Sequence, residues 1–516
     1  MIKLPKKREK EMKKIAIIGG GACGSAALIE LLIQSRTAKL EKEVSFVFIE
    51  RREKAGYGLA FGSKQRTHIL NTQADLMGVY ANEPAHFAEW LKEHGGKYRS
   101  DVKSESDEEN AYTSRILYGH YVAEQLEKNI EIANKNDIKV ERIQAEAFDI
   151  ERLENEKLVI HLTNNSTTEV DEVLLAPGTP KPNTFKQFKD NKNYIDFPWP
   201  TSRLIENTAK NDHVGVLGTS LSAIDTVMSL VDNGHKGKIT MFSPDGMLPR
   251  VQPDENKDFE RRFLTLANLH QIKREKGHAP RAKELFRLFI KDVEEAEGKA
   301  IDWKSLNRDS KDQLPLLEYD IEIAKKGGDS LLNMAYSMRY DTSTIWSWMS
   351  LHEQIIFTKW LGRHWTITRH AIPLHNAKRL AKLMKEGQLQ IIPQNNKVEF
   401  LNDENCFEII TGKDGVFKID KLVNATGSAG KLEEMNNVLV ENLLKKKYLK
   451  PHPIGGAVIN PHTMQCISKN GGSHIYAVGH LVNGMLMDVN AVWFNVKTIA
   501  RLASEIIFKT TTDGDI

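Results

Sequence analysis

The stretch IAIIGGGACGSAALIELL, residues 15–32, decides the fold of this chain. A short apolar run leads into three spaced glycines, Gly19, Gly21 and Gly24, and then into a run of helical character. Strand, G-x-G-x-x-G and helix in this order form the fingerprint of a dinucleotide-binding βαβ unit. The first glycine permits the tight turn, the second lets the backbone approach a pyrophosphate, and the third lets the helix pack closely on the strand.

A second strand completes this unit. Residues 44–49 read VSFVFI and lead directly into Glu50 and Arg51. The Glu50 carboxylate therefore stands where it can accept hydrogen bonds from a ribose. Ala22 and Cys23 stand at the start of the helix, whose unpaired N–H groups and positive dipole end favour phosphates. We expect these four residues to line the dinucleotide site together with the glycines.

A second, weaker unit lies in the middle of the chain. Residues 214–217 read VGVL, and a G-x-S-x-x-A turn follows with Gly218, Ser220 and Ala223. Alanine is normal at the third place of the motif, but serine at the middle place turns a hydroxyl toward the phosphates. Two interpretations stay open: a second dinucleotide site, with the Ser220 hydroxyl donating a hydrogen bond, or a βαβ unit without a ligand.

Two strand-rich segments, residues 138–176 and 388–427, resemble each other. Each closes on a buried strand that ends in a small residue, one spacer and glycine, which fits an antiparallel excursion that returns to a parallel sheet. Residues 255–335 are charged and mainly helical, and we interpret them as a lid or a substrate wall. The tryptophans that follow favour core packing over pocket lining; they are Trp346, Trp348, Trp360 and Trp365.

Composition narrows the function classes. The chain has 516 residues, 40% of them hydrophobic, and a net charge of +3 with basic residues spread out, so we expect no nucleic-acid partner. Its apolar runs are too short to span a bilayer, and it shows no signal peptide, so we expect no membrane partner. Three cysteines without a C-x-x-C pair favour a cytoplasmic location and exclude a redox disulfide. The scattered histidines lack metal-ligand spacing, so no metal site is expected.

Further motifs carry a resemblance to a known family. They are GYGLAF at 56–61, HILNT at 68–72, Met77, PAHFAEWL at 84–91, FPW at 197–199, GMLPR at 246–250, TRHAIP at 368–373 and NATG at 424–427. Over nearly its whole length the chain resembles a bacterial FAD/NAD(P)-binding family that includes flavin-dependent amino-acid N-hydroxylases and urate-hydroxylase-like proteins.

The resemblance implies an α/β fold with two Rossmann-like dinucleotide-binding domains, an FAD domain with an inserted NAD(P) domain, plus a helical insertion. We expect the FAD domain at 12–200 and 411–516, the NAD(P) domain at 201–410, and the helical insertion at about 255–345.

The resemblance also implies roles for single residues. Gly19, Gly21, Gly24 and Glu50 would hold FAD. More of the FAD site would come from residues far along the chain, namely Asn71, Met77, Thr426, Gly427, Gly479 and Asp488. In many flavoproteins an aspartate directly follows the glycine at the position of Gly479, whereas here His480 follows it and Asp488 is the nearest acid.

Two functions remain open. The first is an FAD- and NAD(P)H-dependent oxidoreductase, a monooxygenase that hydroxylates a small amine or amino acid. The second is a flavin-binding redox sensor or partner-binding protein without such turnover.

Asp245, after the second strand of the inserted unit, suits the 2′-hydroxyl of NADH, whereas the resemblance favours NADPH, with Arg250 as a candidate for its phosphate. Arg369 and His370 are candidates for contact with an acidic substrate, although an ion pair of Arg369 within the protein also explains that residue. No catalytic side chain stands out, and the substrate is a small molecule of unknown identity.

Overall fold

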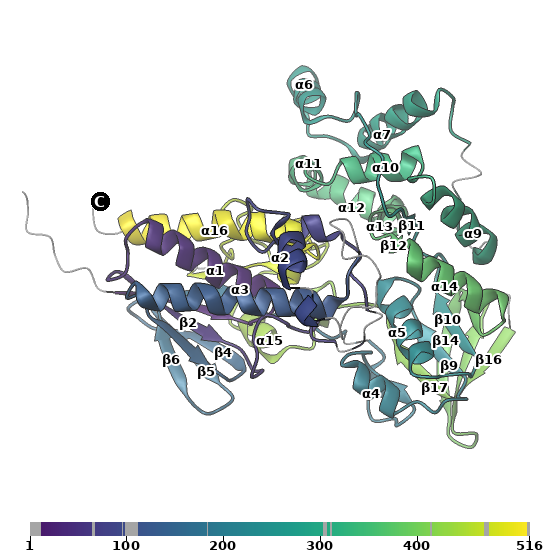
Figure 1. Ribbon diagram of the computed structural model, residues 1–516, viewed down its shortest axis with the longest axis horizontal. Coiled ribbons are helices and arrows are strands. Elements are labelled where there is room, and N and C mark those ends of the chain that lie inside the picture. Colours follow the sequence, from purple (N-terminus) through teal and green to yellow (C-terminus); the bar gives the residue numbers. More distant parts are fainter. Residues whose placement is uncertain are drawn as a thin grey trace, which may run out of the picture.

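The protein is built from two lobes and a helical insertion that stands above the second lobe (Figure 1). The computed structural model describes residues 12–63, 65, 68–94, 96–98, 112–182, 184–302, 307–309, 312–412, 415–468 and 474–512. Each lobe has a five-stranded parallel sheet and an antiparallel three-stranded meander. The two Rossmann-like units expected from the sequence are therefore confirmed.

The first lobe has the strand order β18-β7-β1-β2-β3. Its strands are β1 (Lys13–Ile18), β2 (Val44–Ile49), β3 (Val140–Ile143), β7 (Glu172–Leu175) and β18 (Ile475–Ala477). All but the edge strand β3, which is charged and partly exposed, are mainly buried apolar runs, as expected for a parallel sheet covered on both faces. Helix α1 packs against both α3 and α16. The helices are α1 (Ala22–Thr37), α2 (His86–His94), α3 (Arg115–Lys135), α15 (Val438–Lys445) and α16 (Val492–Thr512), and the meander strands are β4 (Ala147–Arg152), β5 (Leu158–Leu162) and β6 (Thr167–Val170).

The second lobe repeats this plan with the strand order β13-β10-β9-β17-β8. Its strands are β8 (Tyr194–Ile195), β9 (Val214–Leu217), β10 (Ile239–Ser243), β13 (Leu389–Pro393) and β17 (Lys421–Asn424). Its helices are α4 (Thr201–Glu206), α5 (Leu221–Asp232) and α14 (Leu374–Lys385), and its meander is β14 (Asn395–Leu401), β15 (Cys406–Thr411) and β16 (Gly415–Ile419). A separate apolar cluster around Phe407 joins this meander to the sheet.

The helical insertion leaves and rejoins the second lobe at one point. Strands β11 (Val251–Gln252) and β12 (Ile372–Pro373) pair in parallel and close its base. The helices between them are α6 (Leu266–Lys276), α7 (Ala282–Glu297), α9 (Gln313–Ala324), α10 (Ser330–Ser337), α11 (Thr342–Trp348), α12 (Leu351–Trp360) and α13 (Gly362–Arg369). They continue past the expected end at about residue 345, because the tryptophan-rich stretch itself forms α11 to α13. Trp346 is buried in their core, whereas Trp360 is exposed.

The strands that make up the second sheet suggest domain boundaries that differ from those expected. Strand β8 lies before residue 200 and β17 lies after residue 410, yet both belong to the second sheet. The returning chain joins the first core only from Ala429 onward. We therefore propose that the chain crosses between the lobes after β7 and after β17, in place of the expected boundaries at 200 and 410.

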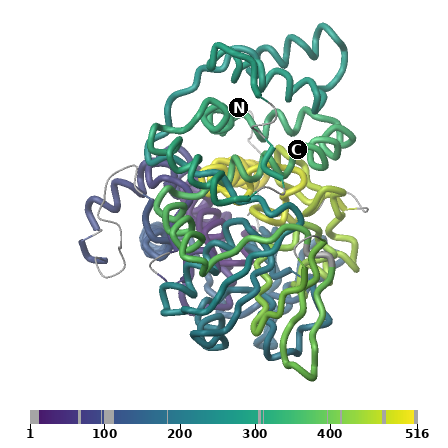
Figure 2. Tube along the Cα trace, turned by 90° about the vertical axis from the view of Figure 1, so that its right-hand side faces the viewer, coloured from purple at the N-terminus to yellow at the C-terminus, as the bar shows by residue number. Residues whose placement is uncertain are grey.

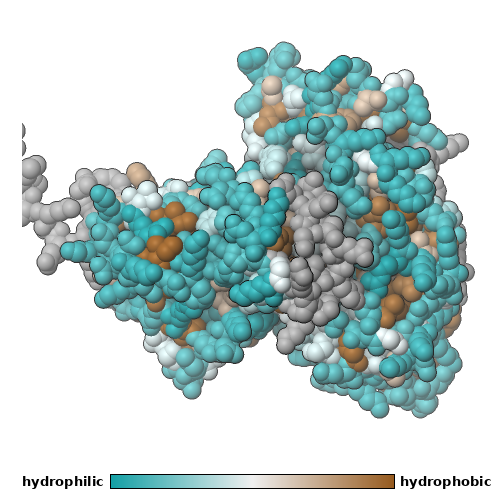
Figure 3. Space-filling view, in the orientation of Figure 1, coloured by the Kyte–Doolittle hydropathy of each residue, from teal (hydrophilic) through white to brown (hydrophobic). Residues whose placement is uncertain are grey.

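Short 3-10 turns connect several of these elements, at η1 (Ala74–Leu76), η3 (Lys186–Phe188), η4 (Leu432–Glu434) and η5 (Gly479–Val482). Figure 2 shows the insertion at the top of the molecule from a second direction. The face in Figure 3 is mainly hydrophilic, with small separate apolar areas. Within the described ranges, none of the helices combines the length and apolarity that crossing a membrane requires.

Candidate functional site

The first glycine turn has the close contacts that its fingerprint predicts. Gly19 has φ +103°, and a Cβ there would lie 2.1 Å from the carbonyl oxygen of Ala176, at the end of β7. A Cβ on Gly24 would lie 1.8 Å from the carbonyl oxygen of Gly19. Neither position has room for a side chain, so both glycines are required by the turn itself.

Gly21 differs, because the space around it is open on one side. A Cβ there would meet only the Cα of Gly58, at 3.4 Å. Gly21 is also the N-cap of α1 and offers no side-chain cap. An open position at an uncapped helix N-terminus is a cradle that fits a pyrophosphate, so this part of the chain fits FAD.

The loop at 56–58 covers this turn, and sequence reasoning gave it no role in the site. The Gly56 N–H donates to the carbonyl oxygen of Gly20 (2.7 Å). A Cβ on Gly58 would lie 3.0 Å from the Cα of Gly21. The sequence feature that could have revealed this loop is the pair Gly56 and Gly58 within the GYGLAF motif, because glycines allow this close backbone approach.

The residues expected beside the turn divide into two groups. Glu50 lies at the turn: its carboxylate accepts hydrogen bonds from the N–H of Gly20 (2.6 Å) and of Arg52 (2.9 Å). Arg51 points elsewhere, toward Glu146 at 3.5 Å, so nothing in its contacts supports a cofactor role. Ala22 and Cys23 begin α1 as expected. Burial raises the pKa of the Cys23 thiol to about 12, which fits packing rather than thiolate chemistry.

The second glycine turn repeats the first one in detail. Gly218 has φ +118°, and its Cβ would lie 2.5 Å from the carbonyl oxygen of Ala425, as that of Gly19 does from Ala176. Ser220 is the N-cap of α5, but its side chain makes no capping hydrogen bond. Ala223 is fully buried against the core, as the third position of the motif requires. The Ser220 hydroxyl therefore remains available to a ligand.

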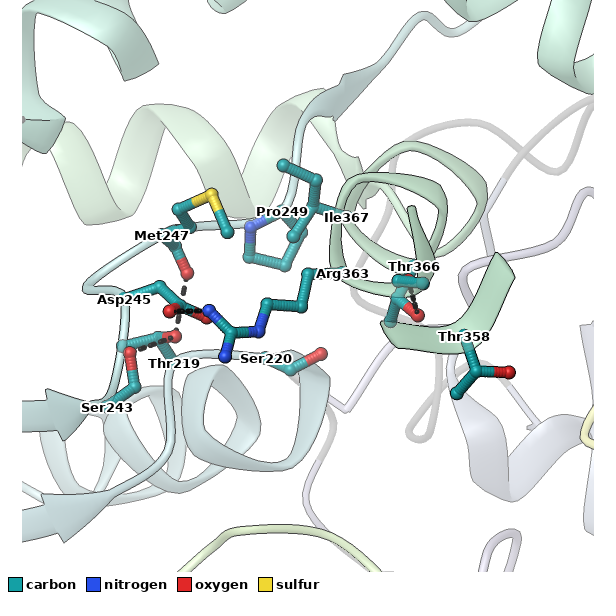
Figure 4. Close-up of a pocket in the computed structure, with 11 residues that line it drawn as sticks. Thr219, Ser220, Ser243, Asp245, Met247, Pro249, Thr358, Arg363, Thr366 and Ile367 are labelled. Atoms are coloured by element: carbon teal, nitrogen blue, oxygen red, sulfur yellow. Dashed lines mark hydrogen bonds and ion pairs between the residues drawn. The ribbon is translucent and has the colours of Figure 1, made fainter. Parts of the chain in front are cut away.

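A cavity of about 390 Å³ opens beside this second turn (Figure 4). Its walls come from the turn, from the segment after β10 and from helices α12 and α13 of the insertion; they are Thr219, Ser220, Ser243, Asp245, Met247, Pro249, Thr358, Gly362, Arg363, Thr366 and Ile367. The Thr219 hydroxyl donates to the carbonyl oxygen of Met247 (2.7 Å), which braces the loop after β10. A cavity at the carboxyl ends of parallel strands is where such a unit binds a dinucleotide.

Two charged residues face each other in this cavity. Asp245 forms an ion pair with Arg363, whose side chain is 62% exposed. Sequence reasoning missed Arg363, since it lies on the distant helix α13.

The suggestion that Arg250 reaches a 2′-phosphate is wrong, because Arg250 is buried and held by Asp329 and Asp320. Burial alone would raise the pKa of Asp329, but the charge of Arg250 holds that pKa below its ordinary value.

The remaining expected residues fall at several places. Thr426 is exposed beside Gly218, and its hydroxyl donates to Asn424 (2.7 Å). A Cβ on Gly427 would meet nothing within 4 Å. Met77 is buried in the first core, and Asn71 is partly buried near it in sequence. The roles of Asn71, Met77, Thr426 and Gly427 in FAD binding stay predictions.

Gly479 and Asp488 lie in different surroundings in the structure. Gly479 lies at the first glycine turn, where its Cβ would approach the Cys23 sulfur at 3.3 Å. Asp488 instead contacts Arg369 at 3.3 Å, and both side chains are buried. The position after Gly479 is taken by His480, whose Nε2 lies 2.9 Å from the carbonyl oxygen of Ala429. The ion pair of Asp488 gives no support for binding of the FAD ribityl chain.

The first glycine turn lies in a segment that matches a known family. Residues 16–180 match the model of a family described as FAD-NAD(P)-binding. This chain carries an FAD-NAD(P)-binding domain. The matched segment contains the first glycine turn, Glu50 and the loop at 56–58, so the predicted cofactor class is confirmed.

Two kinds of relative extend the comparison to the whole chain. The chain is 22% identical over 462 residues to the uncharacterized protein YdhS of Escherichia coli (strain K12), covering 81% of this chain and 83% of YdhS. Among solved structures it is similar to L-lysine 6-monooxygenase of Pseudomonas syringae (TM-score 0.57, 14% identity, 96% of this chain and 99% of that one). It is also similar to ornithine hydroxylase PvdA of Pseudomonas aeruginosa (TM-score 0.56, 12% identity, 96% and 100%). At these identities the structural likeness shows the two-domain flavoprotein fold.

Metal chemistry has no candidate group among the residues that the structure describes, where no three histidine, cysteine, aspartate or glutamate side chains are placed to hold an ion. The three cysteines are free thiols.

Proposed function

We propose that the protein is an FAD-dependent, NAD(P)H-consuming oxidoreductase, and that it is a monooxygenase acting on a small amine or amino acid. The observation that carries the proposal is the duplicated glycine turn: one copy lies in the FAD-NAD(P)-binding domain, and the other opens onto a cavity. Two dinucleotide sites in one chain suit electron transfer from a nicotinamide cofactor to a flavin. When bound, FAD accepts electrons from NAD(P)H and passes them to an acceptor.

The chain's own residues would bind and orient the two cofactors. The first turn and the α1 N-terminus would take the FAD pyrophosphate, and Glu50 would accept hydrogen bonds from the adenosine ribose. Ser220 and the α5 N-terminus would take the phosphates of the nicotinamide cofactor. We propose that Arg363 contacts a 2′-phosphate, which favours NADPH, because a guanidinium suits a phosphate and Asp245 alone would repel it.

Oxygen as the acceptor is supported by the thiols. The three cysteines are free thiols, which are already reduced and therefore cannot accept electrons from a reduced flavin. The similar structures include a lysine monooxygenase and an ornithine hydroxylase, which supports an amine as the group hydroxylated.

Anaerobic reduction followed by admission of oxygen tests the proposal. We expect NADPH to bleach the flavin absorbance, and oxygen to restore it with hydroxylated product from one of L-ornithine, L-lysine or cadaverine. Ser220→Tyr should block reduction by NADPH but not by dithionite, since the side chain would fill the cavity. Ser202→Tyr, at an exposed position on α4, is the matched control. Reduced flavin that survives in air, or that passes electrons only to a partner protein, would favour a redox sensor instead.

A further inference from the structure

The helical insertion meets the first lobe at the segment 484–488. The Trp346 indole N–H donates to the carbonyl oxygen of Gly484 (3.0 Å), and the Met487 N–H donates to the Ser343 hydroxyl (3.3 Å). At the C-terminus of α13, Arg369 reaches Asp488. Helix α13 therefore extends from the dinucleotide cavity, at Arg363, to the FAD-binding lobe, at Arg369.

A cationic cluster lies at this junction. The guanidinium carbons of Arg369 and Arg339 lie 5.4 Å and 5.5 Å from the centre of the Tyr336 ring. Arg339 also lies 5.8 Å from the ring of Trp493, at the start of α16. Burial, and then the charge of Arg369, lowers the pKa of Arg339. Two cations thus share one partly aromatic site in which each destabilises the other.

The described part of the chain provides one carboxylate for these two cations. Asp488 contacts Arg369, but Arg339 has no ion pair with any described carboxylate. The Nε atoms of both arginines, and the second carboxylate oxygen of Asp488, are buried without a hydrogen-bond partner among the described residues. Leaving buried charged donors unpaired is costly, so such groups are normally completed by a ligand or a counter-ion.

We propose that Arg339 and Arg369 form a binding site for the carboxylate of a small molecule. A carboxylate would balance the second cation and accept hydrogen bonds from the guanidinium N–H groups. The rings of Tyr336 and Trp493 add flat apolar surface, which suits an unsaturated or aromatic body beside the carboxylate. A diamine, which carries only cations, is disfavoured here.

The site lies at the end of α13 that contacts the FAD-binding lobe, opposite the end that lines the dinucleotide cavity. A substrate must reach the flavin held by the first lobe, so a carboxylate bound at this junction would belong to the substrate. This last identification rests on the proposed function, whereas the binding site itself does not.

Calorimetric titration of the FAD-loaded protein, without NAD(P)H, tests the binding site. Benzoate and acetate are the carboxylate probes, and benzylamine matches benzoate in shape with the opposite charge. We expect one benzoate per chain, bound about tenfold or more tighter than benzylamine, and a similar loss of benzoate affinity in Arg339→Met and in Arg369→Met. The control is Arg262→Met, since Arg262 is an exposed arginine of the same insertion that pairs with Glu295.

Folding is checked in the same variants. Arg339→Met removes a partly exposed cation that has no ion pair with any described carboxylate and lies close to the Arg369 cation, so its melting temperature should stay close to that of the wild type. Arg369→Lys, which keeps the charge that faces Asp488, replaces Arg369→Met if the latter does not fold, and should also weaken benzoate because the planar fork is lost.

Three results would overturn the inference: neither carboxylate binds more tightly than benzylamine, Arg339→Met keeps wild-type affinity, or NADP⁺ competes with benzoate, which would assign the arginines to the phosphates of the dinucleotide. NADPH oxidation is measured separately. Its absence counts against the proposed function, whereas loss of benzoate binding counts against the carboxylate site.

Discussion

Gly21→Ala should separate the folding role of the first glycine turn from its cofactor role. Gly21 has φ −74° and ψ −171°, which alanine adopts readily. A Cβ there is in ordinary contact, at 3.4 Å, with the Cα of Gly58. The free energy of unfolding of the cofactor-free protein should therefore change by less than about 1 kcal/mol.

Gly24→Ala is the matched comparison at the other end of the turn. Its Cβ would lie 1.8 Å from the carbonyl oxygen of Gly19, a backbone atom that cannot rotate away. The helix must then shift away from the strand, at a cost of about 1–3 kcal/mol or more. The two alanine variants thus differ in stability for a reason visible in the structure.

Gly21→Ala, which should affect stability less than Gly24→Ala, should affect FAD binding more. In the proposed site the pyrophosphate approaches Gly21, so the new methyl group displaces it from the α1 N-terminus. Loss of one charged hydrogen bond costs about 1.5–3 kcal/mol, or about 10- to 150-fold in Kd. Thermal unfolding of the cofactor-free proteins and titration with FAD, followed by quenching of flavin fluorescence, measure both effects. Wild-type FAD affinity in Gly21→Ala would refute the placement of the pyrophosphate.

Three further predictions follow from the contacts. Arg363→Ala should raise Kd for NADPH about tenfold or more and leave Kd for NADH nearly unchanged; equal losses would show that Arg363 does not distinguish the 2′-phosphate. His68 is buried between Ser63 and Ser229, and burial lowers its pKa. The unfolded chain therefore binds the proton more readily, so stability falls as pH drops below about 6.5; His68→Gln should flatten that part of the curve of melting temperature against pH, and an unchanged slope would contradict this. Arg250→Met removes a buried guanidinium that pairs with the partly buried carboxylate of Asp329 and lies 3.6 Å from the buried carboxylate of Asp320, and urea unfolding should show a loss of about 3–5 kcal/mol, whereas a loss below about 1 kcal/mol would mean that the pair is solvated.

Most of the fold prediction came from local sequence patterns. The glycine turns at Gly19 and Gly218 were visible because a turn between a buried strand and a helix restricts residue choice within six positions. The meanders were visible because each ends in the same sequence of small residue, spacer and glycine. The FAD-NAD(P)-binding character of the first unit followed from the same local signals.

Contacts between distant segments were not visible. Arg363 meets Asp245 across 118 positions, and the pairing depends on how the insertion folds back onto the second lobe. The ion pair of Asp488 with Arg369 spans 119 positions, so the role suggested for Asp488 ignored its partner. The insertion extends past its expected end because the tryptophan-rich stretch, interpreted as favouring core packing over pocket lining, itself forms helices of the insertion.

The two glycine turns share one backbone geometry but differ in what covers them. The loop at Gly56 and Gly58 closes over the first turn, with backbone contacts to Gly20 and Gly21. The second turn opens onto a cavity whose far wall includes the exposed Arg363 side chain. A covered site must open locally before its ligand leaves, whereas an open one exchanges ligand without that cost. The proposed functions of the two turns need this difference: an oxidoreductase retains its flavin through many cycles, while it must release the oxidised nicotinamide cofactor in each. We therefore propose that the covering loop, rather than the fingerprint shared by both turns, keeps a cofactor resident at the first site and leaves the second site free to exchange one.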